Sequence, residues 1–323
     1  MKKLVSVVLA LVMLLGMTTI AMADLPSIGV AVYKFDDTFM TGVRNAITAA
    51  AEGIAVIDIA DSQNAQPTQN DQVQMFVSKG VDALAINPVD RTACAEISKM
   101  AGDIPVVYFN REPIAEEMVD FDKWWYVGAK AEESGTMSGQ ILVDYFTANP
   151  TEDGVIYYVM LTGEPGHQDA ELRTIFSVKA LEDAGFELVE VAKDTAMWDR
   201  VRGQDKMAAW LAAFDRIDAV LANNDDMALG AIEALKAEGY FSEGKFMPVV
   251  GVDATAPALE ALKEGTLLGT VLNDAVNQGR ATLLLAVAAA TGDFSTFPFT
   301  IEDGHYVWVP YQMVTEDNYT EFE

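Results

Sequence analysis

The chain has 323 residues, of which 51% are hydrophobic and 22% charged, a composition typical of a globular protein large enough for two domains. Acidic residues outnumber basic ones 49 to 21. This balance excludes nucleic acid and anionic membrane surfaces as partners, because contacts to phosphate groups need clustered Lys and Arg. The single cysteine, Cys94, excludes an internal disulfide framework and a thiolate-rich metal cluster.

Residues 1–23 have the features of an export signal. MKK provides a positively charged start, LVSVVLALVMLLGM an apolar core, and TTIAMA a small-x-small ending, which together predict cleavage after Ala23. The apolar run is shorter than the roughly 20 residues that a membrane-spanning helix needs. No cysteine lies near the cleavage site, so a lipid anchor there is excluded. We therefore expect an exported, periplasmic protein whose mature chain begins at Asp24.

From residue 27 onward, short apolar runs alternate with amphipathic segments. The strand-like runs are, in chain order, SIGVAVYKF, IAVIDIA, DALAINPV, IPVVYFN, VIYYVMLTG, FELVEVA, IDAVLANND, MPVVGVDA and LGTVLND. Helix-like segments such as DTFMTGVRNAITAAAEG and GQDKMAAWLAAF, with apolar residues three and four positions apart, lie between them. Continuous apolar strands separated by helices predict parallel sheets covered on both faces. Because both halves share this rhythm, we expect two Rossmann-like, doubly wound α/β domains.

Polar residues follow most of these apolar runs. In open parallel sheets, ligands bind beyond the carboxyl ends of the strands. The candidate binding residues at those ends are Asp36, Asp37, Asn110, Arg111, His167, Asp169, Asn223, Asn224, Asp225, Asp253, Asn273 and Asp274. Any one of them taken alone is more simply a cap for the next helix. A whole series from two domains that face each other favours a ligand site.

The sequence gives little support to metal-dependent or nucleophilic catalysis. The two histidines, His167 and His305, are far apart in the sequence, and there is neither an HExxH nor a GxSxG motif. Cys94 lies in a helix-like segment and is expected to be a small buried apolar residue.

Two readings remain for the carboxylates. Asp37, Asp169 and Asp253 would give a glycosidase its pair of acids. Carboxylates, amides and arginine are equally the groups that hydrogen-bond sugar hydroxyls. Phe39 and Trp198 occupy corner positions suited to stacking on the apolar face of a sugar ring, although ordinary core packing also accounts for Phe39.

Several longer stretches carry a resemblance to a known family. They include IGVAVYKFDDTFM, PVVYFNREP, GEPGHQDAELR, DTAMWD, ANNDDMALGAIEALK, GVDA and GTVLND, within residues 27–317. The chain resembles the periplasmic galactose/glucose-binding proteins, which feed ABC sugar importers and can signal to chemoreceptors. The resemblance implies a type I periplasmic binding protein fold and a protein that is not an enzyme. A binding protein for ribose or xylose is the closest alternative, and a glycoside-processing enzyme the more distant one.

Each pocket position of that family has a counterpart here. The ligand-binding residues that the resemblance implies are Asp37, Phe39, Asn110, His167, Asp169, Arg173, Trp198, Asn224, Asp253 and Asn273. It implies that Phe39 and Trp198 sandwich a pyranose ring and that Asp37 accepts from the 4-hydroxyl. Asp169 would accept from the anomeric hydroxyl and also buttress Arg173.

The resemblance also implies two lobes joined by three chain crossings, near residues 127–129, 273–275 and 307–310. The first lobe would comprise residues 24–127 and 275–307, and the second residues 128–274 and 308–323. The expected partners are a monosaccharide, the membrane permease of an ABC importer and a chemoreceptor, and the protein is expected to be a monomer.

One family feature does not carry over. Relatives often hold a structural calcium in an EF-hand-like loop of pattern DxNxDGQxQ, completed by a distant Glu. The matching stretch is NPTEDGVIY, in which Asn149, Thr151 and Tyr157 replace oxygen ligands, Asp218 stands for the distant Glu, and Asp153 keeps its carboxylate. Calcium prefers six to eight oxygens with several carboxylates. We therefore expect no cofactor and no tight calcium site.

Overall fold

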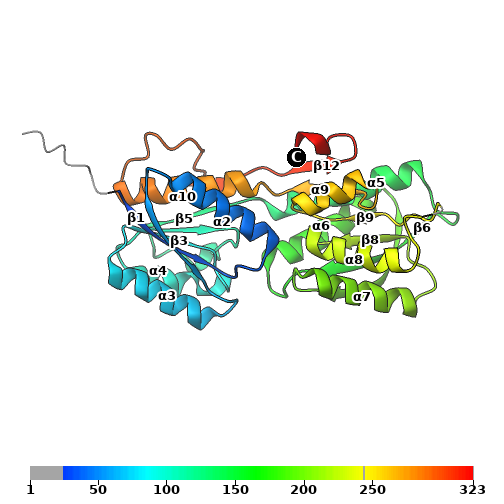
Figure 1. The fold of residues 1–323 in the computed structure, drawn as a ribbon, viewed down its shortest axis with the longest axis horizontal. Coiled ribbons are helices and arrows are strands. Elements are labelled where there is room, and N and C mark those ends of the chain that lie inside the picture. Colours follow the sequence, from blue (N-terminus) through cyan, green and yellow to red (C-terminus); the bar gives the residue numbers. More distant parts are fainter. Residues whose placement is uncertain (1–24, 243, 323) are drawn as a thin grey trace, which may run out of the picture.

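The computed structural model describes residues 25–242 and 244–322, which form two α/β lobes lying end to end (Figure 1). The predicted export signal, residues 1–23, lies outside the described residues. No helix among the described residues is long and apolar enough to cross a membrane.

The first lobe is built on a sheet of parallel strands in the order β11-β5-β4-β3-β1-β2. Its strands are β1 (Ser27–Val32), β2 (Val56–Asp61), β3 (Ala83–Ile86), β4 (Val106–Phe109), β5 (Trp124–Gly128) and β11 (Tyr306–Trp308). Its α-helices are α2 (Thr38–Ala51), α3 (Gln66–Lys79), α4 (Cys94–Ala101) and α10 (Ala275–Thr291). Helices α2 and α10 pack together on one face of the sheet, and α3 and α4 on the other (Figure 1).

The second lobe repeats this plan with strand order β12-β10-β9-β8-β6-β7. Its strands are β6 (Val155–Thr162), β7 (Glu187–Thr195), β8 (Ala219–Ala222), β9 (Val249–Val250), β10 (Gly269–Leu272) and β12 (Gln312–Thr315). Its α-helices are α5 (Ala131–Ala148), α6 (Gln168–Asp183), α7 (Arg200–Ala213), α8 (Asp225–Ala237) and α9 (Ala256–Lys263). Only β12, at the sheet edge, runs antiparallel to its neighbour among the described pairs. Short 3₁₀ turns span Arg91–Ala93, Ala115–Glu117 and Tyr319–Glu321.

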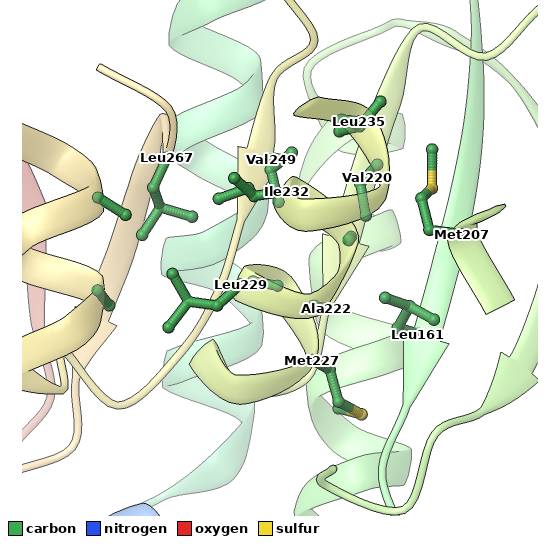
Figure 2. Packing of buried hydrophobic residues seen from close by; sticks show 14 of the residues in the cluster. Leu161, Met207, Val220, Ala222, Met227, Leu229, Ile232, Leu235, Val249 and Leu267 are labelled. Carbon is green, nitrogen blue, oxygen red and sulfur yellow. The ribbon is translucent and has the colours of Figure 1, made fainter. Parts of the chain in front are cut away.

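Each sheet is buried on both faces, as the continuous apolar runs predict. Figure 2 shows one of these cores, in which Ile232 and Leu235 of α8 pack against Val220 and Val249 of the sheet. These four side chains are at most 1% exposed. Cys94 is also buried and has no disulfide partner, which confirms the expected apolar role.

The predicted fold class, two Rossmann-like parallel-sheet domains with three connections between them, is confirmed. All nine strand-like runs contain a strand. Three further strands were not predicted: β5, β11 and β12. The run of β5, WWYVG, is mostly aromatic, whereas β11 and β12 are short edge strands with little apolar periodicity.

The chain passes between the lobes three times. The connections are residues 129–130 between β5 and α5, 273–274 between β10 and α10, and 309–311 between β11 and β12. Strands β5 and β11 each end one residue beyond the lobe boundaries expected at 127 and 307. The carboxyl ends of the strands in both sheets therefore open toward the space between the lobes.

Candidate functional site

One cavity, with about 340 Å³ of space, lies where the two lobes meet. It is lined by all ten residues expected to bind the ligand: Asp37, Phe39, Asn110, His167, Asp169, Arg173, Trp198, Asn224, Asp253 and Asn273. Tyr33, Met40 and Arg111 complete the lining. Both lobes contribute, so the cavity exists only while they are together.

Several cavity residues also cap helices. Asp37 Oδ1 accepts from the Met40 amide at 2.8 Å at the start of α2, and Asn224 Oδ1 accepts from the Met227 amide at 3.0 Å at the start of α8. Capping uses only one polar atom of each side chain. The capping and binding interpretations are therefore compatible, because Asp37 Oδ2 and Asn224 Nδ2 remain on the cavity side of the residue.

The structure does not bring four other strand-end candidates into the cavity lining. Asp36 is exposed and lies 3.9 Å from the Lys34 ammonium, and Asp274 caps α10. Asn223 accepts from the Gly163 amide at 3.0 Å, and Asp225 accepts from the Thr270 hydroxyl at 2.6 Å. For these four residues the structural interpretation is sufficient.

Arg173, on α6, is the most heavily hydrogen-bonded side chain of the cavity. Its guanidinium donates to Ser134 Oγ at 3.2 Å, to the Asn223 carbonyl at 2.9 Å, and to Asp169 Oδ2 and the Tyr311 hydroxyl at 3.0 Å each. It is only 4% exposed. Such a buried fork, held from several sides, is fixed in direction before any ligand arrives.

Burial perturbs the acids beside this arginine. Burial raises the pKa of Asp169, which the Arg173 charge opposes, and it raises the pKa of Asp253 strongly. Asp253 Oδ1 lies 4.0 Å from Arg173 Nη1 and accepts from Asn273 Nδ2 at 3.2 Å. Since a buried carboxylate is costly without hydrogen-bond donors, these acids favour a ligand that brings donors of its own.

Unusual backbone conformations cluster at the cavity. Asn110, Trp198 and Asp253 have φ values of 62°, 63° and 122°. Non-glycine residues rarely adopt positive φ, and each instance costs on the order of 1–3 kcal/mol. The fold therefore supports strain at the positions that aim these three side chains, which is common at binding sites.

Two aromatic side chains come from opposite lobes. Phe39 begins α2 in the first lobe, and Trp198 precedes α7 in the second. The Trp198 ring is held by Gly163, where an added Cβ would lie 2.0 Å from the ring, and meets His167 edge-on with centroids 5.1 Å apart.

His167 is held neutral. Burial lowers its pKa well below the ordinary value, and the charges of Arg111, Arg173 and Arg91 act in the same direction. Its Nδ1 accepts from the Asp169 amide at 3.1 Å, which leaves the proton on Nε2. His167 is thus suited to donate a hydrogen bond.

Unsatisfied polar atoms also point to a ligand. Three buried side-chain atoms among the described residues lack a hydrogen-bond partner: Arg111 Nε, Trp198 Nε1 and Gln278 Oε1. Arg111 and Trp198 both line the cavity. Buried donors are nearly always paired in folded proteins, so a polar ligand would complete this site.

Tyr33 and Met40 were missed by the sequence analysis. Tyr33 donates to Asp37 Oδ2 at 2.5 Å, and its ring lies 3.9 Å from the Arg111 guanidinium carbon. It therefore positions both residues. The available signal was its place at the carboxyl end of β1, where it was taken for one more apolar strand residue.

The described residues contain no cluster of three or more His, Cys, Asp or Glu side chains placed to hold a metal ion. The cavity offers carboxylates, amides, a guanidinium fork, a neutral imidazole and two aromatic rings, but no nucleophile. Fold and site together define a two-lobed binding protein that encloses a small polar ligand between its lobes.

The comparisons with known proteins agree. The chain belongs to the periplasmic binding protein family: the model described as "Periplasmic binding protein domain" matches residues 28–293. It is 42% identical to the D-galactose/methyl-galactoside binding periplasmic protein of Haemophilus influenzae over 95% of each chain. It is 28% identical to the ribose import binding protein of Escherichia coli, over 84% of this chain and 86% of that protein.

A solved structure shares both fold and sequence. An ABC transporter solute binding protein from Bacillus halodurans, with bound myo-inositol, is 34% identical, with a TM-score of 0.80 over 93% of this chain and 98% of that one. Membership of a solute-binding family confirms the expectation that the protein is not an enzyme.

Proposed function

We propose that the protein binds D-galactose or D-glucose in the interlobe cavity and delivers it to the permease of an ABC importer. The observation that carries the proposal is the convergence of polar and aromatic side chains from both lobes on one enclosed cavity. The 42% identity to a galactose-binding relative supports the choice of sugar. In this proposal the protein acts as a monomer, and its closed form is also presented to a chemoreceptor.

The chemistry of the cavity suits a pyranose. Its hydroxyls would donate to Asp37, Asp169 and Asp253, whose buried oxygens need donors. Arg173 and Asn110 would donate to the ring oxygen and its neighbouring hydroxyl, and the remaining amides would complete the hydroxyl contacts. Phe39 and Trp198, from opposite lobes, would cover the two apolar faces of the ring.

Lobe closure would be the signal that a transporter reads. We propose that the three connections act as a hinge between a first lobe of residues 24–127 and 275–307 and a second lobe of residues 128–274 and 308–323. The ligand contacts both lobes only in the closed form, so its binding free energy favours closure.

The proposal includes export to the periplasm by residues 1–23. The family is periplasmic, which supports this location. Intact mass of the protein recovered from a periplasmic extract tests the cleavage site, and a chain beginning at Asp24 is the expected result.

A monosaccharide thermal-shift panel tests the ligand. Galactose, glucose, ribose, xylose and myo-inositol are added to the purified mature protein at equal concentration. A ligand at 100 times its Kd stabilises the folded state by about 2.7 kcal/mol, which raises the Tm by several degrees. The largest shifts are expected from galactose and glucose. A larger shift with ribose, xylose or myo-inositol would overturn the choice of sugar, and no shift with any of them would overturn the proposed class of ligand.

A further inference from the structure

A second cluster of charged groups lies at the opposite end of the second sheet from the cavity. Asp153 directly precedes β6, and Arg216 and Asp218 directly precede β8. The cavity residues His167 and Asn224 follow the other ends of these same strands. Strand β6 has eight residues and therefore spans roughly 26 Å, so this cluster is not part of the ligand site.

The centre of the cluster is the Arg216 guanidinium. It donates to both Asp153 oxygens, with Nη1 to Oδ2 at 2.7 Å and Nη2 to Oδ1 at 3.0 Å. Its Nε donates to the Asp218 oxygens at 3.1 and 3.0 Å, and Nη2 also donates to the Val155 carbonyl at 2.9 Å. One cation is therefore surrounded by five oxygens from two separate loops.

The surroundings hold this arrangement in place. The guanidinium carbon lies 4.2 Å from the centre of the Tyr157 ring. Asp218 Oδ2 accepts from the Tyr157 amide at 2.9 Å, and Asp153 Oδ1 accepts from the Val155 amide at 3.1 Å. Hydrogen bonds from Arg216, together with that from the Val155 amide, hold the pKa of Asp153 well below its usual range.

The same residues do not fit calcium. The family's loop would place metal ligands at residues 149, 151, 153, 155 and 157, completed by residue 218. Here Asn149 Nδ2 donates back to the Tyr145 carbonyl at 3.0 Å, and Tyr157 presents a ring to Arg216. The oxygens of Asp153, Val155 and Asp218 already accept from a cation. Too few oxygens remain for a cation that requires six to eight.

We propose that the Arg216 guanidinium is a built-in cation that replaces the family's calcium and ties the loop before β6 to the loop before β8. An ordinary exposed ion pair would contribute little, because solvent screens it and two flexible side chains must be ordered. This cation differs in being bidentate toward Asp153, shared with Asp218 and a backbone carbonyl, and stacked on an aromatic ring. Such pre-organised geometry reduces the entropy lost per hydrogen bond.

Thermal unfolding of the purified mature protein tests the proposal. Wild type is expected to have the same Tm with a chelator as with about 1 mM calcium, the concentration at which weak extracellular sites fill. R216M is expected to lower the Tm by about 3 °C or more. R202M, which removes an exposed arginine of α7, serves as the matched control and should leave the Tm unchanged.

A further variant separates charge from geometry. R216K keeps the positive charge but cannot form the fork, so its Tm should lie between those of wild type and R216M, and it carries the comparison if R216M does not fold. Sugar-induced Tm shifts should be equal in wild type and R216K, since the cluster lies far from the cavity. A wild-type Tm that falls on chelation and recovers with calcium overturns the proposal, as does a Tm of R216M or R216K equal to that of R202M.

Discussion

Across the cleft, Arg111 Nη2 of the first lobe donates to Glu164 Oε2 of the second at 2.8 Å, with side chains only 6% and 13% exposed. Asn64 Nδ2, also of the first lobe, donates to the other oxygen of Glu164 at 3.2 Å. Arg111 lines the ligand cavity as well. Glu164 therefore fastens the closed lobes at the wall of the cavity, without being one of the residues expected to contact the ligand.

We predict that E164Q weakens sugar binding about tenfold, which corresponds to about 1.4 kcal/mol. The substitution leaves the buried Arg111 charge without its carboxylate in the closed form only, so it raises the free energy of closure. Isothermal titration calorimetry measures the change in Kd. E171Q, which alters an exposed acid of α6, is the control, and equal Kd values for E164Q and E171Q would contradict the latch.

The ten cavity residues could be predicted because most of them directly follow a strand, where chain order and sheet topology place them together. Their shared cavity did not require the contact pattern to be known in advance. Glu164 and Arg111 were a different case. Their partnership spans 53 positions and depends on how closely two lobes approach, which no local pattern encodes.

Arg216 shows the same limit from another side. The loss of calcium ligands is visible in NPTEDGVIY, so the absence of a tight calcium site could be predicted. The replacement cation could not, because Arg216 and Asp153 lie 63 residues apart and meet only once β6 and β8 are paired. Short edge strands such as β11 escaped prediction for a related reason: pairing with β5, rather than periodicity, makes them strands.

We predict that sugar affinity falls as the pH drops below about 6.5, and that part of this fall depends on His167. The imidazole has a lowered pKa in the closed form, where it is buried near three arginines, and regains an ordinary pKa near 6.5 when the lobes open. The closed form therefore binds fewer protons than the open form. Closure is favoured above pH 6.5 and opposed below it, by at most tenfold in Kd per pH unit.

H167N provides the comparison for this pH dependence. Asparagine keeps an acceptor for the Asp169 amide at the start of α6 but does not titrate. Asp169 and Asp253 have raised pKa values and would contribute the opposite slope in both proteins. The difference between wild type and H167N, measured by calorimetry from pH 5 to pH 8, therefore isolates His167. Parallel profiles would show that His167 does not change its protonation on closure.

Removing either of two cavity groups should weaken sugar binding at least tenfold without unfolding the protein. Trp198→Ala removes one aromatic cover of the ring, and Asp253→Ala removes a buried acceptor expected to take sugar hydroxyls. Calorimetry gives the Kd values, and thermal melts without sugar show that both variants are folded. Near-unchanged titrations for both would overturn the assignment of the cavity as the sugar site.

The support behind Trp198 can be tested without touching the cavity lining. A Cβ at position 163 would lie 2.0 Å from the Trp198 ring, so Gly163→Ala must push the indole out of its place. We predict that Gly163→Ala weakens sugar binding about tenfold.

A double-mutant cycle with Trp198→Ala gives the control for Gly163→Ala. If the glycine acts only through the tryptophan, adding Gly163→Ala to Trp198→Ala should change the Kd no further, because the ring that it displaces is already absent. Equal losses in both backgrounds would instead mean that Gly163 acts through its backbone, whose amide donates to Asn223 at 3.0 Å and whose carbonyl accepts from the Thr195 hydroxyl at 2.6 Å.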